Sequence, residues 1–164
     1  MNSLLYIPFK HQLIGKVHVD EFFIRGTEEQ KHGGRKGTKQ LVVVALEKVK
    51  EGVGLAYAQI IEHASAKEFK PFFKNYVDTK ANVITDEWTG YLPLKNEYKN
   101  LKQVPSNDGK NFPDLHIYIM NLKGWLRGIH HPCSKERLQG YLYEYHYRYN
   151  RIVKNNPKRI GDKE

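Results

Sequence analysis

KVHVDEFFI, the stretch at residues 16–24, decides the fold of this chain and carries an acid, Asp20, in its middle. Its β-branched and aromatic residues would face both sides of a pleated strand, so we expect a central strand of a sheet. A carboxylate buried in such a strand is costly unless a cation or several hydrogen-bond donors meet it. Asp20 is therefore either one half of a salt bridge at a strand end or a ligand of a metal ion.

The composition is that of one basic domain. The chain has 164 residues, enough for a hydrophobic core, and a formal net charge of +9. This charge predicts a polyanionic partner, either nucleic acid or an anionic membrane surface. No apolar run approaches the length needed to span a bilayer, which disfavours the membrane. The single cysteine, Cys133, excludes an internal disulfide framework and a cysteine-based zinc ribbon, and it fits a reducing cytosol.

The order of the expected elements indicates an α/β fold. Apolar runs at residues 41–49 and 53–61 extend the first strand into an antiparallel meander, and a helix is expected at residues 65–77. Ser65 is its expected N-cap, and Glu68 completes a capping-box pattern. A strand at residues 81–86 then ends in a second acid, Asp86, and a strand after a helix implies a crossover. Two further helices are expected at residues 113–127 and 134–153, while residues 95–104 are either helical or extended.

A glycine-rich basic loop separates the first two strands. Residues 25–40 read RGTEEQKHGGRKGTKQ and contain no large apolar side chain, which predicts a solvated loop. The loop is either a charged surface turn or a contact for DNA phosphates. The candidates for phosphate contact are Arg35, Lys36 and Lys39, which we call the basic trio.

Asp20 and Asp86 become informative when they are considered together. A meander followed by a crossover strand makes their two strands neighbours, and two adjacent acids repel each other unless a cation lies between them. Paired carboxylates that hold two divalent ions are a standard arrangement for phosphoryl transfer. A third ligand is expected from the first of the two late helices, on which His116 and Asn121 are the polar candidates. Lys123 stands on the same side of that helix as His116.

Four segments of the chain resemble the catalytic domain of DDE-type insertion-sequence transposases in the retroviral-integrase superfamily. VDEFFIRG around Asp20 is similar to the family's first-acid strand, and TDEWTGY around Asp86 is similar to its second-acid motif. HGGRKGTK resembles the basic turn that follows the first strand, and NLKGWLRGIHH with LQGYLYEYHYRYNR resembles the closing helices. The resemblance covers residues 15–151, and four motifs in the right order are more specific than any one of them.

The resemblance implies an RNase H-like fold, with a mixed sheet of about five strands and helices packed on both faces. It implies a two-metal site for Mg²⁺ or Mn²⁺ and the strand cleavage and strand transfer of DNA transposition. The implied partner is double-stranded DNA, as transposon ends and as target. A homo-oligomer assembled on DNA and a bacterial, nucleoid-associated location follow from the same resemblance. The lack of a membrane partner and the cytoplasmic location are expected already from the short apolar runs and the single cysteine.

The chain departs from the family pattern at the third acid. The usual glutamate, seven residues before a helical lysine, corresponds here to His116 before Lys123. Some branches of the family are similar in carrying His or Asn there. We therefore assign His116 as the third metal ligand, with Asn121 as the alternative ligand. The competing interpretation is that His116 binds no metal and is only a histidine on the helix surface near DNA. Lys123 is expected to contact a phosphate near the cut, and Arg127 is expected to bind DNA with the basic trio.

The expected domain is residues 16–153, preceded by a remnant of an upstream region at residues 1–15 and followed by a polar tail at residues 154–164. Full transposases that resemble this chain have a zinc-binding and helix-turn-helix region that recognises the transposon ends. We therefore expect a catalytic half that binds DNA without sequence preference. Two other interpretations share the fold, namely a catalytically inactive DNA-binding remnant and an RNase H-like nuclease without strand transfer.

Overall fold

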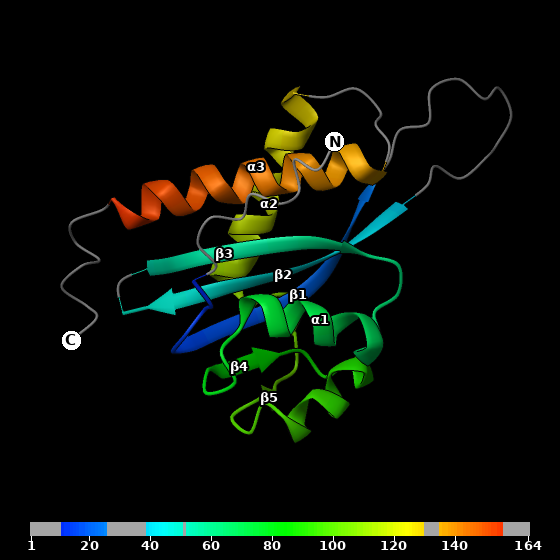
Figure 1. Cartoon of the computed structure of the whole chain (residues 1–164), viewed down its shortest axis with the longest axis vertical. Coiled ribbons are helices and arrows are strands. Elements are labelled where there is room, and N and C mark those ends of the chain that lie inside the picture. The colour runs from blue at the N-terminus through cyan, green and yellow to red at the C-terminus, as the bar shows by residue number, and fades with distance from the viewer. Residues whose placement is uncertain (1–10, 26–38, 51, 130–134, 156–164) are drawn as a thin grey trace, which may run out of the picture.

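Five strands form one mixed sheet in the described part of the molecule (Figure 1). The computed structural model describes residues 11–25, 39–50, 52–129 and 135–155. The strands are β1 (Lys16–Arg25), β2 (Lys39–Val49), β3 (Gly52–Ile61), β4 (Asn82–Thr85) and β5 (Lys102–Gln103). The helices are α1 (Ala66–Tyr76), the 3-10 helix η2 (Thr89–Asn96), α2 (Pro113–Ile129) and α3 (Lys135–Lys154). Within these residues, no helix combines the length and hydrophobicity that a bilayer-spanning segment needs.

β1 is the central strand of the sheet, as its sequence predicts. The spatial order is β3-β2-β1-β4-β5, so β1 has a neighbour on each side. β1 pairs antiparallel with β2 along its whole length, and β2 pairs antiparallel with β3. β1 pairs in parallel with β4, which returns to the sheet after α1. The predicted meander and crossover are both confirmed.

The two faces of the sheet carry separate cores, because side chains alternate along each strand. Val17 and Val19 of β1 belong to the core on the side of α1 and η2, where Phe69, Phe72 and Phe73 of α1 are fully buried. The opposite face contributes another set of strand residues to the core that contains α2 and α3: Phe22, Ile24, Val42, Val44, Leu46, Ala56, Ala58 and Ile60. Helices therefore cover both faces, which confirms the predicted α/β fold of the RNase H-like type.

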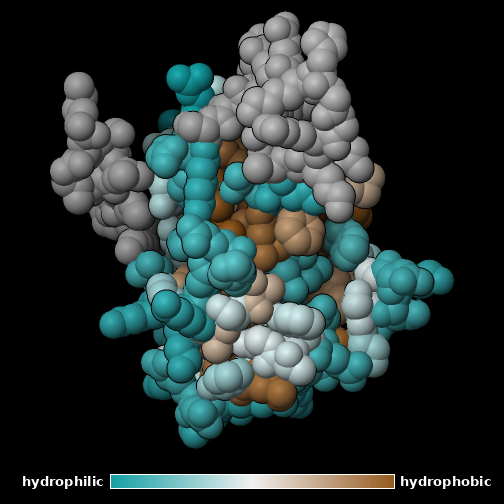
Figure 2. Space-filling model, turned by 90° about the vertical axis from the view of Figure 1, so that its right-hand side faces the viewer, coloured by the Kyte–Doolittle hydropathy of each residue, from teal (hydrophilic) through white to brown (hydrophobic). Residues whose placement is uncertain are grey.

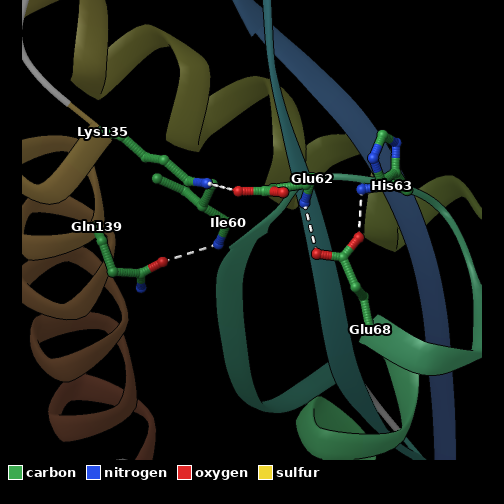
Figure 3. A network of polar contacts seen from close by, with 6 residues as sticks. All are labelled: Ile60, Glu62, His63, Glu68, Lys135 and Gln139. Carbon is green, nitrogen blue, oxygen red and sulfur yellow. Dashed lines mark hydrogen bonds and ion pairs between the residues drawn. The ribbon is translucent and has the colours of Figure 1, made fainter.

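The start of α1 differs from the predicted capping box. Ser65 occupies the N-cap position, but its side chain makes no capping hydrogen bond. The carboxylate of Glu68 accepts hydrogen bonds from the backbone N–H groups of Glu62, at 2.9 Å, and His63 (Figure 3). The chain between β3 and α1 turns so that these two amides, and not that of Ser65, point at Glu68. The same corner is tied to α3, since Lys135 Nζ lies 3.0 Å from Glu62 Oε1.

α3 runs beside β3 and bonds to it through its side chains. Asn150 accepts a hydrogen bond from the N–H of Ala56 at 2.8 Å and donates one to its C=O at 2.9 Å. His146 Nδ1 and Gln139 Oε1 accept hydrogen bonds from the N–H groups of residues 58 and 60, at 3.3 and 2.8 Å. Residues 56, 58 and 60 alternate along β3, so their backbone groups all point away from β2.

Two shorter segments complete the fold. The stretch at residues 95–104, left open between helix and strand, contains the end of η2 and the two residues of β5. Leu13, inside the segment predicted as an upstream remnant, is fully buried and forms a bridge with Val77. Its packing joins residue 13 to the α1 side of the domain, whereas residues 1–10 and 156–164 lie outside the described residues.

Candidate active site

Asp20 and Asp86 meet where two parallel strands run side by side. His18 of β1 pairs with Ile84 of β4, and the same register continued by two residues sets Asp20 beside Asp86. Oxygen atoms of Asp20, Glu21 and Asp86 all lie within 4.8 Å of one another. The predicted proximity of the two acids is confirmed, and their role as metal ligands stays a prediction.

Glu21 is an acid of this cluster that sequence reasoning missed. Alternation along β1 directs it to the face opposite Asp20, toward η2. There its carboxylate accepts a hydrogen bond from the hydroxyl of Tyr91, a residue with 0% exposure. Tyr91 belongs to the same TDEWTGY segment as Asp86, so this bond connects the two acid motifs directly. No local sequence pattern signals this contact, because Glu21 and Tyr91 are 70 residues apart in the chain.

Burial raises the pKa of both acids on β1. The pKa of Asp20 rises from 3.8 to about 6, with burial as the main cause, an opposing hydrogen bond from the Glu21 N–H at 2.8 Å, and a further increase from Asp86. The pKa of Glu21 rises from 4.5 to about 7 because of burial, while the Tyr91 hydroxyl lowers it and the two other acids raise it. Among the described residues, no ion pair includes these acids.

These three carboxylates fit a divalent metal ion. Mg²⁺ and Mn²⁺ prefer oxygen ligands, and a bound cation favours the charged form of every acid around it. Burial and mutual repulsion, which raise the two pKa values, are the costs that such a cation offsets. The carboxylates that would hold the ion are Asp20 and Asp86, with Glu21 within reach.

His116 lies on α2, which packs on the face of β1 that carries Asp20. An electrostatic effect of His116 lowers the pKa of Asp20. His116 Nε2 is buried and has no hydrogen-bond partner among the described residues. A Cβ atom at residue 109 would collide with the imidazole, so Gly109, with a φ of 80°, allows the loop to pass this close.

Asn121 points elsewhere on α2. It is exposed, and five residues after His116 it lies about 140° further round a helix with 3.6 residues per turn. His116 and Lys123, seven residues apart, lie nearly in line along the helix. This geometry favours His116 over Asn121 as the residue that reaches the acids from α2.

The predicted DNA-binding residues that the structure describes lie on two elements, α2 and β2. Lys123 is half-buried, with Nζ 5.3 Å from the ring centre of Phe22, two residues beyond Asp20 on the same face of β1. Arg127, one turn further along α2, is exposed. Lys39 begins β2 and lies with Nζ 5.8 Å from the ring centre of Phe23. The other two members of the basic trio lie outside the described residues.

A second histidine, His18, is buried two residues before Asp20 on the same face of β1. It is 6% exposed, and neither ring nitrogen has a hydrogen-bond partner within the described ranges. Its ring meets Phe112 edge-on, with the ring centres 5.1 Å apart. Burial, followed by the charges of Lys16 and Lys48, lowers its pKa to about 4, so the imidazole is neutral at physiological pH. His18 thus acts as a packing residue between β1 and the start of α2.

An RNase H-like sheet with paired acids at the carboxyl ends of two adjacent parallel strands fits the class of DDE-type transposase domains. The family model described as ISXO2-like transposase domain matches residues 12–150. The match covers most of the chain, and the chain belongs to this family. The comparisons with curated proteins and with solved structures gave no match.

Proposed function

We propose that this chain is the metal-dependent catalytic domain of an insertion-sequence transposase, which cuts DNA strands and joins the resulting 3′-hydroxyl to target DNA. The observation that supports this function best is the juxtaposition of Asp20 and Asp86 on neighbouring parallel strands of a chain in this family. DDE-type transposases use divalent metal ions, and these carboxylates offer the oxygen ligands that such ions prefer. The proposed ions are two Mg²⁺ or Mn²⁺.

Each residue of the candidate site has a proposed role. Asp20 and Asp86 hold the metal ions, His116 is the third ligand, and Asn121 is the alternative. Bound divalent ions supply activation of the attacking hydroxyl and stabilisation of the leaving oxygen. Lys123 contacts a phosphate beside the cut, where its single positive charge offsets the charge of the DNA backbone. The hydrogen bond from Tyr91 fixes Glu21 beside the two ligands.

DNA binding is proposed to depend on charge and not on sequence. The chain carries 27 Lys and Arg residues against 18 Asp and Glu residues, and phosphate contacts dominate non-specific affinity. The basic trio, Lys123 and Arg127 are the proposed contacts. Transposon ends and target DNA would bind a homo-oligomer that assembles on the DNA. Footprinting of a short DNA end by the isolated chain, if it showed selective protection, would contradict the proposed lack of sequence preference.

Cleavage of a supercoiled plasmid tests the catalytic proposal. The experiment compares the parent with Asp20→Asn, Asp86→Asn and Glu87→Gln in Mg²⁺ and in Mn²⁺. Glu87 is the exposed acid next to Asp86, outside the acid cluster, and so provides a matched control. We expect nicking to fall to background in the two Asn variants and to persist in Glu87→Gln, with duplex DNA affinity nearly unchanged in all three. Titration of Mn²⁺, followed by electron paramagnetic resonance, should show weaker metal binding in the two Asn variants only.

Equal nicking by the parent and the Asp20→Asn/Asp86→Asn double variant would refute the assignment. The absence of an acid at position 116 favours a second candidate, a DNA-binding domain without catalysis. That candidate predicts DNA binding by the parent with no metal-dependent nicking. An RNase H-like nuclease would nick DNA but would not join a 3′-hydroxyl end to a second duplex, so a strand-transfer assay separates it from a transposase.

A further inference from the structure

Large hydrophobic side chains are exposed close to the acids in sequence. Phe23 follows Asp20 by three residues and is 54% exposed, and Trp88 follows Asp86 by two residues and is 48% exposed. In Figure 1 the strands β1 and β4 both point to the right-hand side, and Figure 2 looks onto that side. Hydrophobic surface is visible there among hydrophilic side chains, below the grey atoms. An exposed indole in a strongly basic protein, beside a charged site, calls for a physical explanation.

Trp88 is held firmly although half of it is exposed. Its indole Nε1 donates a hydrogen bond to the C=O of Ala64 at 2.7 Å, and its own C=O accepts one from Gln103 Nε2 at 2.8 Å. A Cβ atom at residue 90 would come within 2.7 Å of the indole and 2.6 Å of the Ala64 oxygen, so Gly90 is required for this placement. The only polar atom of the side chain is therefore already bonded to protein. What remains available to a ligand is the aromatic ring itself.

The position of Trp88 is coupled to that of Asp86. The Trp88 N–H donates to Asp86 Oδ1 at 3.0 Å. Gln103 of β5 also connects the two residues, because its Nε2 donates hydrogen bonds to the backbone C=O of Asp86 at 2.9 Å and of Trp88 at 2.8 Å. A ligand on the indole is thus set at a fixed position relative to the second acid. Such a coupling suits a substrate that reaches both residues at once.

We propose that Trp88 is a stacking surface for a nucleobase of the DNA end, so that the site accepts a nucleotide that has left the base stack next to the phosphate that is cut. The inference rests on the proposed function, because it takes the phosphate to lie at the acids. Every base has an aromatic face, and single-stranded DNA commonly binds through aromatic side chains beside a basic groove. Lys39 beside Phe23 supplies a cation for the adjoining phosphates. Enzymes that act on an unstacked nucleotide take it out of the duplex in this way.

Binding measured in EDTA tests the inference without cleavage. Three fluorescent DNA ends are compared at moderate salt: a blunt duplex, a duplex with two unpaired bases, and the same duplex with abasic sites in place of those bases. We expect the parent to bind the unpaired bases more tightly than the abasic sites by about 5- to 150-fold, the equivalent of about 1–3 kcal/mol. This preference should disappear in Trp88→Leu, which keeps an apolar side chain, and should largely persist in Trp88→Phe.

The matched control is Leu92→Ala. Leu92 is 47% exposed and lies four residues beyond Trp88, but it has no aromatic face, so its loss should leave the preference for unpaired bases intact. The inference is overturned if the parent binds abasic and base-containing ends equally, or if Trp88→Phe loses the preference as fully as Trp88→Leu. It is also overturned if Trp88→Leu keeps the preference for unpaired bases and differs from the parent only in the sedimentation mass of the DNA-free protein. Trp88 would then be a contact between copies of the chain. Plasmid nicking is independent of these results, so the catalytic proposal and the stacking inference can fail separately.

Discussion

Replacement of Asp20 by Asn should stabilise the metal-free protein while it removes activity. Asn has nearly the same shape as Asp and keeps the oxygen that accepts the Glu21 N–H at 2.8 Å. What the substitution removes is a negative charge that burial and Asp86 both disfavour. Unlike most substitutions of partly buried residues, which destabilise, this one relieves an unfavourable electrostatic interaction.

The magnitude follows from the pKa of Asp20. The value is 3.8 in the unfolded reference and about 6 in the folded protein, and each unit of difference corresponds to about 1.4 kcal/mol. The folded state therefore binds the proton more tightly, and the free energy of unfolding falls as pH rises from about 4 to about 6. Above that range the ionised Asp20 lowers the free energy of unfolding by about 3 kcal/mol, and at pH 5 by about half of this. Glu21, with a pKa of about 7, extends the decline toward neutral pH.

Urea denaturation at pH 5 and pH 8, in EDTA and in Mn²⁺, measures these quantities. In EDTA we expect Asp20→Asn to exceed the parent in unfolding free energy by up to about 3 kcal/mol at pH 8, with a smaller gain at pH 5. In Mn²⁺ the parent should gain stability from binding and the variant should gain little. Glu87→Gln, which replaces an exposed acid, serves as the control with no expected gain. A variant less stable than the parent in EDTA at pH 8 would refute the electrostatic reasoning.

Three further predictions concern the third ligand, the DNA contacts and the fold. If His116 is a ligand, cleavage should be faster in Mn²⁺ than in Mg²⁺, because Mn²⁺ accepts nitrogen more readily, and His116→Glu should narrow or reverse that ratio. An unchanged ratio in that variant, together with loss of cleavage in Asn121→Ala, would transfer the role to Asn121. Replacement of the basic trio with Ala should reduce the slope of log affinity against log salt concentration, and an unchanged slope would make the loop a solvated turn. Asn150→Leu leaves the N–H and C=O of residue 56 without partners and should cost about 2–3 kcal/mol in urea denaturation. Asn155→Leu, at an exposed position, should stay within about 0.5 kcal/mol of the parent.

The features that follow from local pattern and strand order could be predicted from sequence. β1 has apolar residues on both faces and therefore belongs in the middle of a sheet. A meander followed by a crossover leaves few places for β4, so the proximity of Asp20 and Asp86 follows from the order of elements alone. The exact register between β1 and β4, in which His18 pairs with Ile84, cannot be obtained from any sequence pattern.

The features that depend on the path of the chain between elements could not be predicted. Alternation assigns Glu21 to the face away from Asp20, and only the packing of η2 returns its carboxylate to the cluster through Tyr91. The Glu68 pattern predicted a capping box, but the turn after β3 presents different amides to that side chain. In the same way, nothing in the sequence around Trp88 indicates that its indole would be fixed by Ala64, 24 residues earlier.

The contacts between α3 and β3 have a consequence for how copies of this protein can associate. Along residues 56–60 the helix takes the place that a sixth strand would occupy, since its side chains occupy backbone groups that an added strand would need. At the other side of the described sheet, β5 has only two residues, too few to serve as a template for a further strand. Within the described residues, neither border of the sheet therefore favours strand addition by a second copy. Copies that assemble on DNA, as proposed above, would instead associate through helices, loops or the DNA itself. The described part of the sheet therefore disfavours edge-to-edge aggregation.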